Sequence, residues 1–549
     1  MTNHQSKHPR DIRVMLQDIG DPLTRMPWPP TPEGLLSASI DPIKDTAIEV
    51  YAYGLYHAGG CTHDSKAYQK VGDNIAVMHE SSGLQMREGT KRLIEQGRDP
   101  ITIMCEGAHA AGKDFWLRMR MNDTHDRVGQ YRKIESPTKK PKEGHLEPYY
   151  YTPQWKKDNP QWLIGDPDEP HPQYSFESQE ANAPNYVHAP IREMMFALAQ
   201  EAVCNYDIDG FEIDFIRFPY LFPVQTAWAH RKVMTAFVAK LRTMIDEQAK
   251  RRNRPIYFSA RLPDTVELSA RIGLDLPTWF SQGLLDMCVV SGGYSPFSTP
   301  WRDIVDLAGK HGTPTLACLS ASTLNHWRWN PSLPVSGVEP TVQQRREHIR
   351  AAACRAYEHG ISGFELWNMF YLFNHYYTPA QLEGGHNLGY GFTRDIADRS
   401  ALAGMRKAYL LDWEIPLAGT YGHVSWCAQR PLMITPATDG IGQSVTFNIG
   451  DDLSAAEHAK IELWINIVDL FPEDVIEFEF NGHVLQPRDE TYKGQTMFSN
   501  REFRFDLMAN LVCRGDNELA IYLRQRTKDL EQFVTLNFAR LTIDPSGDG

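Results

Sequence analysis

The sequence predicts an α/β protein in which a (β/α)8 TIM barrel is followed by a C-terminal β-sandwich. Three observations lead to this fold class. Strand-like and helical segments alternate between about residues 11 and 410, polar and apolar side chains alternate within several strands, and helical patterns disappear after about residue 424. Repeated strand–helix–strand units imply a parallel sheet, and eight such units close into a barrel. We therefore expect a barrel domain over residues 1–423 and a sandwich domain over residues 424–549.

The predicted barrel strands are eight short segments. In chain order they are Ile12–Gln17, Ile48–Tyr56, Asp114–Met121, Ile208–Phe215, Ile256–Arg261, Met287–Ser291, Thr315–Ser320 and Ser362–Trp367. The helices between them are predicted from amphipathic segments, among them Ile191–Val203, Ala227–Lys250, Trp301–His311 and Val342–Glu358.

The alternation within the strands predicts a charged barrel interior. Phe211, Ile213 and Phe215 lie on one face of the fourth strand, and Glu212 and Asp214 lie on the other. Because the outer face of a barrel packs on helices, the polar face of each strand is expected to point inward. The residues expected inside are Glu49, Tyr51, Tyr53, Arg118, Arg120, Asn122, Glu212, Asp214, Ser259, Arg261, Glu365 and Trp367. Buried charges of this kind must compensate one another.

The third connection of the barrel is unusually long. Residues 123–188 are rich in proline, aromatic and charged residues. A loop of this length in a compact domain is usually functional, and after a barrel strand it would lie over the C-terminal mouth.

The C-terminal region reads as a sandwich of about 120 residues. Asn481-Gly482 is a strong signal for a hairpin turn. The role of this domain, glycan binding or packing on the barrel, is left open by its pattern. Its predicted strands are Ser444–Ile449, Lys460–Val468, Val475–Phe480, Arg501–Leu507, Glu518–Leu523 and Val534–Ile543.

Composition and missing motifs exclude several functions. The chain has 56 Lys and Arg against 69 Asp and Glu, a formal net charge of −13, which disfavours nucleic acid as a partner. The 8 Cys form no CxxC pair, so a zinc ribbon and a thioredoxin motif are excluded. A P-loop, a GxGxxG after the first strand and a GxSxG elbow are absent, and no cofactor is expected.

The N-terminal segment and the hydropathy pattern bear on location. Residues Met1–Arg10 are polar and contain no apolar signal region, and no run of about 18 apolar residues occurs. We expect a cytoplasmic protein with no membrane partner.

The segment Tyr206–Pro219, YDIDGFEIDFIRFP, is the most informative in the chain. It resembles the signature of the bacterial glycosyl-hydrolase-like family 10 barrels at the fourth strand. Arg118–His125, Asn159–Ile164 and Asn185–Arg192 are similar to further motifs of that group. The resemblance covers roughly residues 11–410 in scattered motifs. It implies a glycosidase-type barrel acting on a carbohydrate, without specifying the glycan.

Four carboxyl groups are candidates for catalysis, because glycoside cleavage needs two carboxyl groups flanking the bond. Asp214 is the first choice, since it ends the fourth strand; an ion pair with Arg120 or Arg261 is the alternative. Glu212 lies one side chain deeper. Glu365, at the end of strand eight, and Asp264, after strand five, are the candidates for the partner of Asp214.

Polar and aromatic side chains near the strand ends are candidates for contact with a sugar. Asn122, Asp123 and His125 end strand three, where hydrogen bonds to hydroxyl groups are common; Asp123, His125 and Asp126 form a weak metal-binding pattern. Trp327 and Trp329 are further stacking candidates. The remaining predicted substrate contacts are Arg118, Arg120, Arg217, Arg261, Trp367, Asn368 and Tyr53.

The leading hypothesis is therefore a glycoside hydrolase of an oligo- or polysaccharide with paired carboxylates centred on Asp214. Two alternatives stay open: a catalytically silent carbohydrate-binding protein on a glycosidase barrel, and a metal-dependent barrel hydrolase.

Overall fold

A computed structural model describes most of the chain. The described residues are 6–57, 59–74, 81–124, 152–166, 180–320, 342–369, 389–412, 429–430, 432–437, 440–454, 456, 458–494, 499–528, 530–531 and 533–547. Most of the long connection 123–188 therefore lies outside them.

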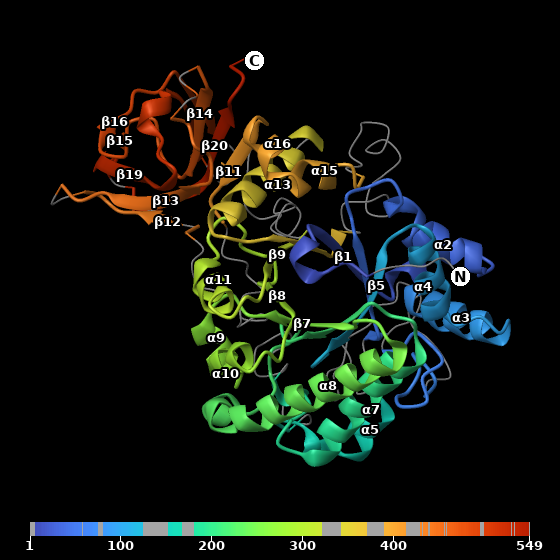
Figure 1. Ribbon diagram of the computed structural model, residues 1–549. Coiled ribbons are helices and arrows are strands. Elements are labelled where there is room, and N and C mark those ends of the chain that lie inside the picture. Colours follow the sequence, from blue (N-terminus) through green and yellow to red (C-terminus); the bar gives the residue numbers. More distant parts are fainter. Residues whose placement is uncertain are drawn as a thin grey trace, which may run out of the picture.

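Eight parallel strands form a closed barrel, which confirms the predicted fold class (Figure 1). The order around the barrel is β1-β10-β9-β8-β7-β6-β5-β2. Each strand overlaps a predicted segment, and the largest shift is two residues, at β1. The bounds are β1 (Val14–Ile19), β2 (Val50–Gly54), β5 (Asp114–Arg120), β6 (Gly210–Asp214), β7 (Tyr257–Leu262), β8 (Met287–Val290), β9 (Thr315–Ser320) and β10 (Gly363–Trp367).

Helices surround the barrel, with α7 and α8 side by side along one flank (Figure 1). The four predicted helices are confirmed, although a 3-10 turn, η4 (Val224–His230), replaces the start of the second. The helices are α1 (Asp21–Arg25), α2 (Pro32–Ser39), α3 (Ser81–Glu95), α4 (Pro100–Ala110), α5 (Gln154–Asp158), α7 (Ala189–Asn205), α8 (Arg231–Arg252), α9 (Val266–Arg271), α10 (Leu276–Ser281), α11 (Arg302–Gly309), α13 (Val342–Glu358), α15 (Thr393–Ala397) and α16 (Arg399–Ala403).

Strand register places the predicted polar faces of β5, β6 and β7 inside the barrel. Arg118 pairs with Glu212, and Glu212 with Ser259; one step further, Asp214 pairs with both Arg120 and Arg261. In-register residues of neighbouring parallel strands point to the same side. Apolar side chains of the interior form a separate cluster that includes Met15, Val50, Ala52, Trp116, Met287, Val289, Leu316 and Cys318.

The second strand has the opposite parity from the one predicted. Tyr51 pairs with Phe115 and Tyr53 with Leu117, both of which belong to the core outside the barrel. Val50 and Ala52 face the interior instead. Treating tyrosine as a polar residue caused the error, because its ring packs among helices while its hydroxyl finds a partner.

Glu49 is likewise outside the interior. It precedes β2 at the bottom of the barrel, where its carboxylate contacts Lys7 Nζ at 2.6 Å and accepts a hydrogen bond from the Arg13 N–H.

The C-terminal region contains two packed antiparallel sheets, as predicted. One has the order β11-β20-β14-β18-β17, with β12 paired to β20, and the other β13-β19-β15-β16. The strands are β11 (Lys407–Leu410), β12 (Leu432–Ile434), β13 (Gln443–Ile449), β14 (Lys460–Val468), β15 (Val475–Phe480), β16 (His483–Val484), β17 (Asp489–Gly494), β18 (Ser499–Leu507), β19 (Gly515–Gln525) and β20 (Val534–Asp544).

Two details of this region bear on the predictions. Asn481 and Gly482 form the predicted two-residue turn between β15 and β16, with φ values of 49° and 77°. β11 belongs to a sheet of the sandwich although it precedes residue 424. The boundary at residues 423 and 424 stays a prediction.

Within the described part of the chain, no helix is both long and apolar enough to cross a membrane.

Candidate functional site

Five charged side chains meet inside the barrel, from the three adjacent strands β5, β6 and β7 and from β10 across the barrel. Arg118 comes from β5, Glu212 and Asp214 from β6, Arg261 from β7 and Glu365 from β10, and each is at most 1% exposed. The structure thus brings together three of the four predicted catalytic carboxyl groups, with two of the predicted arginines between them.

Arg118 contacts all three carboxyl groups. Its guanidinium donates a hydrogen bond to Asp214 Oδ2, its Nε lies 3.4 Å from Glu212 Oε1, and its Nη1 lies 3.9 Å from Glu365 Oε1. The predicted ion-pair network of the interior is therefore centred on β5.

Arg261 approaches the same carboxyl groups from β7. Its Nε lies 3.3 Å from Glu365 Oε1, and its Nη1 lies 3.6 Å from Asp214 Oδ2. Its Nη2 donates a hydrogen bond to Cys318 Sγ at 3.3 Å.

Asp214 is held as a carboxylate. Burial alone would raise its pKa, but Arg118 and Arg261 outweigh this effect and keep the pKa of Asp214 well below its usual range. Its Oδ1 also accepts hydrogen bonds from the backbone N–H groups of Ile216 at 2.9 Å and Arg217 at 3.4 Å. Asp214 therefore stays ionised at any pH near neutrality.

Glu212 has the opposite tendency. Burial, and next the nearby carboxylate of Glu365, raise the pKa of Glu212 well above its usual value, although Arg118 acts in the other direction. Ser259 Oγ donates a hydrogen bond to Glu212 Oε2 at 2.9 Å. Two carboxyl groups on alternate positions of one strand thus favour different protonation states.

Glu365 is close to two arginines but is poorly hydrogen-bonded. Neither of its carboxylate oxygens has a hydrogen-bond partner among the described residues, and the same holds for Nε and Nη1 of Arg118 and of Arg261. Most buried polar groups in proteins are hydrogen-bonded, so this cluster is unusual in the number of buried donors and acceptors that bond to no described residue.

The residues at the rim bind one another. Arg120 Nη1 donates to Asp123 Oδ2 at 2.6 Å, and Asn122 Nδ2 donates to the Tyr220 carbonyl at 2.9 Å. Asp264 follows β7 and is 1% exposed.

Trp367 is buried and surrounded. Its ring centre lies 4.5 Å from the Arg261 guanidinium carbon, 5.7 Å from that of Arg217, and 5.2 Å from the ring of Tyr294. Arg217 and Trp367 are thus brought together with the interior cluster, and Asn368 follows directly at the end of β10.

Backbone strain gathers at the same end of the barrel. Phe218, Ser291 and Asn368 have φ values of 55°, 83° and 53°, and they follow β6, β8 and β10. Left-handed conformations cost free energy in residues other than glycine and cluster at functional sites. The sequence motif gave no sign of this strain.

Some predicted contacts lie elsewhere or outside the described residues. Tyr53 points away from the interior, and its hydroxyl hydrogen-bonds with Thr62 Oγ1 at 2.8 Å. His125, Asp126, Trp327 and Trp329 lie outside the described ranges. No group of three or more His, Cys, Asp and Glu side chains among the described residues is arranged to hold a metal ion.

The sequence analysis missed a carboxyl pair at the end of β1. Asp18 Oδ2 accepts hydrogen bonds from Arg25 at 2.7 Å and from the Tyr51 hydroxyl at 3.3 Å. Burial, and then Asp18, raise the pKa of Asp21 well above its usual value, although Arg25 acts in the other direction. The signal available was the polar run QDIGD after the first strand.

Comparison with known proteins assigns the chain to no family. No family model matches the chain, and no curated protein does. The resemblance to glycosyl-hydrolase-like family 10 therefore stays a prediction.

Solved structures similar to this chain include several carbohydrate-active enzymes. A GH18 chitinase from Chromobacterium violaceum is 10% identical, with 97% of this chain and 91% of that chain covered and a TM-score of 0.34. The endo-beta-1,4-mannanase from Thermotoga petrophila is 10% identical, with 96% and 97% covered and a TM-score of 0.41. At these TM-scores the likeness carries no argument about this chain.

Proposed function

We propose that this chain hydrolyses a glycosidic bond of an oligo- or polysaccharide, with Asp214 as the central carboxylate. One observation carries the proposal: Glu212 and Asp214 face the barrel interior from one strand, and their pKa values are shifted in opposite directions. An acid and a carboxylate kept side by side are the pair that glycoside hydrolysis requires.

The proposed mechanism gives one role to a protonated carboxyl group and another to the ionised carboxylate of Asp214. A protonated carboxyl group donates its proton to the leaving oxygen as the glycosidic C–O bond breaks, and Asp214 stabilises or attacks the positively charged sugar carbon. Water supplies the new C–O bond, and its proton restores the acid. Glu212 is the acid that the pKa shift favours, and Glu365 and Asp264 are the other candidates for the partner of Asp214.

Access to these groups requires movement at the rim. Glu212, Asp214 and Glu365 are 0% exposed. We expect substrate binding to displace side chains near the strand ends, among them Trp367 and Arg217. The Trp367 ring makes cation–π contacts with both Arg217 and Arg261.

The test begins with digestion of a panel of polysaccharides, read by mass spectrometry. On the glycan so identified, Asp214→Asn is expected to lower the rate by about 10²- to 10⁴-fold, the range of acid–base catalysis. Glu212→Gln, Glu365→Gln and Asp264→Asn are compared in parallel, and the true partner loses turnover as Asp214→Asn does. Glu106→Gln on the exposed face of α4 is the control. Near wild-type turnover in Asp214→Asn would rule out this role.

A second function, carbohydrate binding without cleavage, is favoured by one observation. The oxygens of Asp214 are occupied by Arg118 and by backbone N–H groups, which is also the arrangement of a structural ion pair. Saturable binding of a glycan that the intact protein never cleaves would favour this function.

A further inference from the structure

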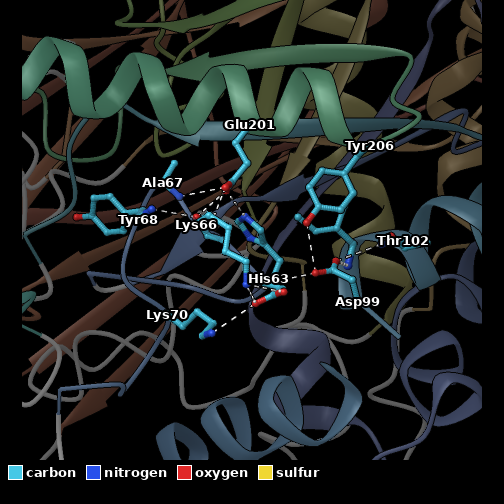
Figure 2. A network of polar contacts seen from close by, with 12 residues as sticks. His63, Lys66, Ala67, Tyr68, Lys70, Asp99, Thr102, Glu201 and Tyr206 are labelled. Carbon is cyan, nitrogen blue, oxygen red and sulfur yellow. Dashed lines mark hydrogen bonds and ion pairs between the residues drawn. The ribbon is translucent and has the colours of Figure 1, made fainter. Parts of the chain in front are cut away.

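A loop after β2, residues 61–70, is hydrogen-bonded to helices on the outside of the barrel, and we call it the clasp loop. Glu201, on α7, accepts hydrogen bonds from Ser65 Oγ at 2.6 Å, the Lys66 N–H at 2.7 Å and the Ala67 N–H at 3.0 Å (Figure 2). His63 Nε2 lies 3.5 Å from the same carboxylate.

A second carboxylate fastens the loop to α4. Asp99, the N-cap of α4, accepts hydrogen bonds from the Asp64 N–H at 2.8 Å and from the Tyr206 hydroxyl at 3.3 Å (Figure 2). His63 is 0% exposed and packs edge-on against Tyr206, with ring centres 5.8 Å apart. The clasp loop is thus held between two helices.

The clasp loop is connected to the strand that carries the site arginines. Ser65 Oγ accepts a hydrogen bond from the Tyr68 N–H at 3.0 Å, and the ring of Tyr68 stacks on that of Tyr56 at 5.5 Å. The Tyr56 hydroxyl donates to the Arg120 carbonyl at 2.7 Å.

The connection falls where β5 loses a neighbour. β2 pairs with β5 only as far as Gly54 and Arg118. Beyond that point the Leu55 N–H donates a hydrogen bond to the Arg118 carbonyl at 2.8 Å, and the Tyr56 hydroxyl donates one to the Arg120 carbonyl. On the other side, the Met121 N–H bonds to the Asp214 carbonyl at 2.9 Å. The Tyr56 hydroxyl is therefore the donor to the last carbonyl of β5 on its β2 side.

We propose that Tyr56 is a positioning residue for Arg120, and that Glu201 holds Tyr56 in place through the clasp loop. Neither side chain belongs to the interior cluster. Arg120 carries the Asp123 contact at the rim, so a displaced Arg120 backbone changes what the rim presents to a ligand. The effect on a carbohydrate rests on the proposed function, whereas the effect on Arg120 does not.

The first measurement follows Arg120 directly. The full chain is labelled with 15N-arginine, and the Arg120 Nε–H resonance is assigned by its loss in Arg120→Lys. Tyr56→Phe and Glu201→Gln are expected to shift this resonance. Tyr522→Phe, which removes a hydroxyl bonded to Glu479 in the sandwich, and Glu106→Gln are the matched controls and leave it unchanged. An unmoved Arg120 resonance in Tyr56→Phe overturns the proposal.

The second measurement uses the glycan that the digestion panel identifies. Tyr56→Phe is expected to raise KM by about 2- to 10-fold, the range of one neutral hydrogen bond, with kcat within about twofold of wild type. A shifted resonance without a change in KM overturns the role in ligand binding. If the resonance shifts but no glycan is cleaved or bound, the positioning of Arg120 by Tyr56 and the clasp loop is supported, and the proposed glycosidase function fails.

Discussion

Glu201, which is half-buried, and Glu212, which is fully buried, lie on consecutive elements, α7 and β6, and their pKa values are shifted in opposite directions. Glu201 accepts hydrogen bonds from a hydroxyl and two backbone N–H groups, and His63 Nε2 lies 3.5 Å from its carboxylate. Burial alone would raise its pKa, but these donors lower the pKa of Glu201 to about 2. Glu212 lies among other carboxyl groups, and its pKa is raised well above the usual value.

The difference separates two kinds of buried polar network. At the clasp loop, each carboxylate oxygen of Glu201 accepts a hydrogen bond, which is the pattern of a group that holds structure in place. In the interior cluster, donors on Arg118 and Arg261 and both acceptors of Glu365 are unused. Incomplete hydrogen bonding of this kind has a cost in stability, and function is the usual reason for which proteins retain it.

The largest expected effect comes from removing the arginine shared by the interior carboxyl groups. Arg118→Met leaves Asp214 without its main partner, and we expect the free energy of unfolding to fall by about 3–5 kcal/mol. Urea denaturation at pH 7 measures it. Arg98→Met breaks an exposed pair with Glu106 and is expected to cost less than about 1 kcal/mol. A loss below about 1 kcal/mol in Arg118→Met would mean that the interior charges are hydrated.

A smaller effect distinguishes the two carboxyl groups of β6. Asp214→Asn removes a negative charge that two arginines require and is expected to cost about 2–4 kcal/mol. The raised pKa of Glu212 favours its neutral form, which Gln resembles, so we expect Glu212→Gln to cost about 1 kcal/mol or less. Thermal and urea unfolding of both variants provide the comparison. Equal losses would show that Glu212 is ionised in the folded protein, against the direction of its pKa shift.

The smallest effect is in the pH dependence, where the two glutamates differ in sign. The folded-state pKa of Glu201 is depressed to about 2, so its contribution is complete above about pH 4.5 and is lost as the pH falls toward 2. The pKa of Glu212 is raised, so its contribution to stability falls as the pH rises above about 4.5. We expect the stability difference between wild type and Glu201→Gln to shrink as the pH falls below about 4.5. We expect the stability of wild type relative to Glu212→Gln to fall as the pH rises above about 4.5. Parallel slopes in urea titrations from about pH 2 to 7 would contradict this difference in sign.

Much of the fold was predictable because strand patterns depend on nearby residues. The alternation of GFEID and the apolar runs of the other strands located all eight barrel strands to within two residues. β2 shows the limit: Tyr51 and Tyr53 read as polar, and only the register with Phe115 and Leu117 assigns them to the outer core. β11, β12, β16 and β17 were missed because they are short or strongly polar, and pairing with neighbours defines them.

The site divides in the same way. The alternation of polar and apolar residues within the strands was enough to bring Glu212, Arg118, Arg261 and Glu365 into consideration beside Asp214, because parity on parallel strands directs side chains to a common interior. The protonation states of these groups could not be predicted from the sequence. They depend on which guanidinium lies nearest to which oxygen across four strands, and Coulomb interactions in a dry interior change strongly over a few ångströms.

The sequence by itself thus determined the order of the strands along the chain, the two-part architecture and the charged groups of the interior cluster, although it wrongly placed Glu49 inside the barrel. The tertiary structure alone decided the parity of β2, the pairing of Arg118 with three carboxyl groups, the opposite pKa shifts of Glu201 and Glu212, and the contact of Tyr56 with Arg120. The physical reason is one of range: secondary structure and parity follow from neighbours in sequence, whereas desolvation, ion pairing and hydrogen-bond satisfaction depend on residues brought together from distant segments.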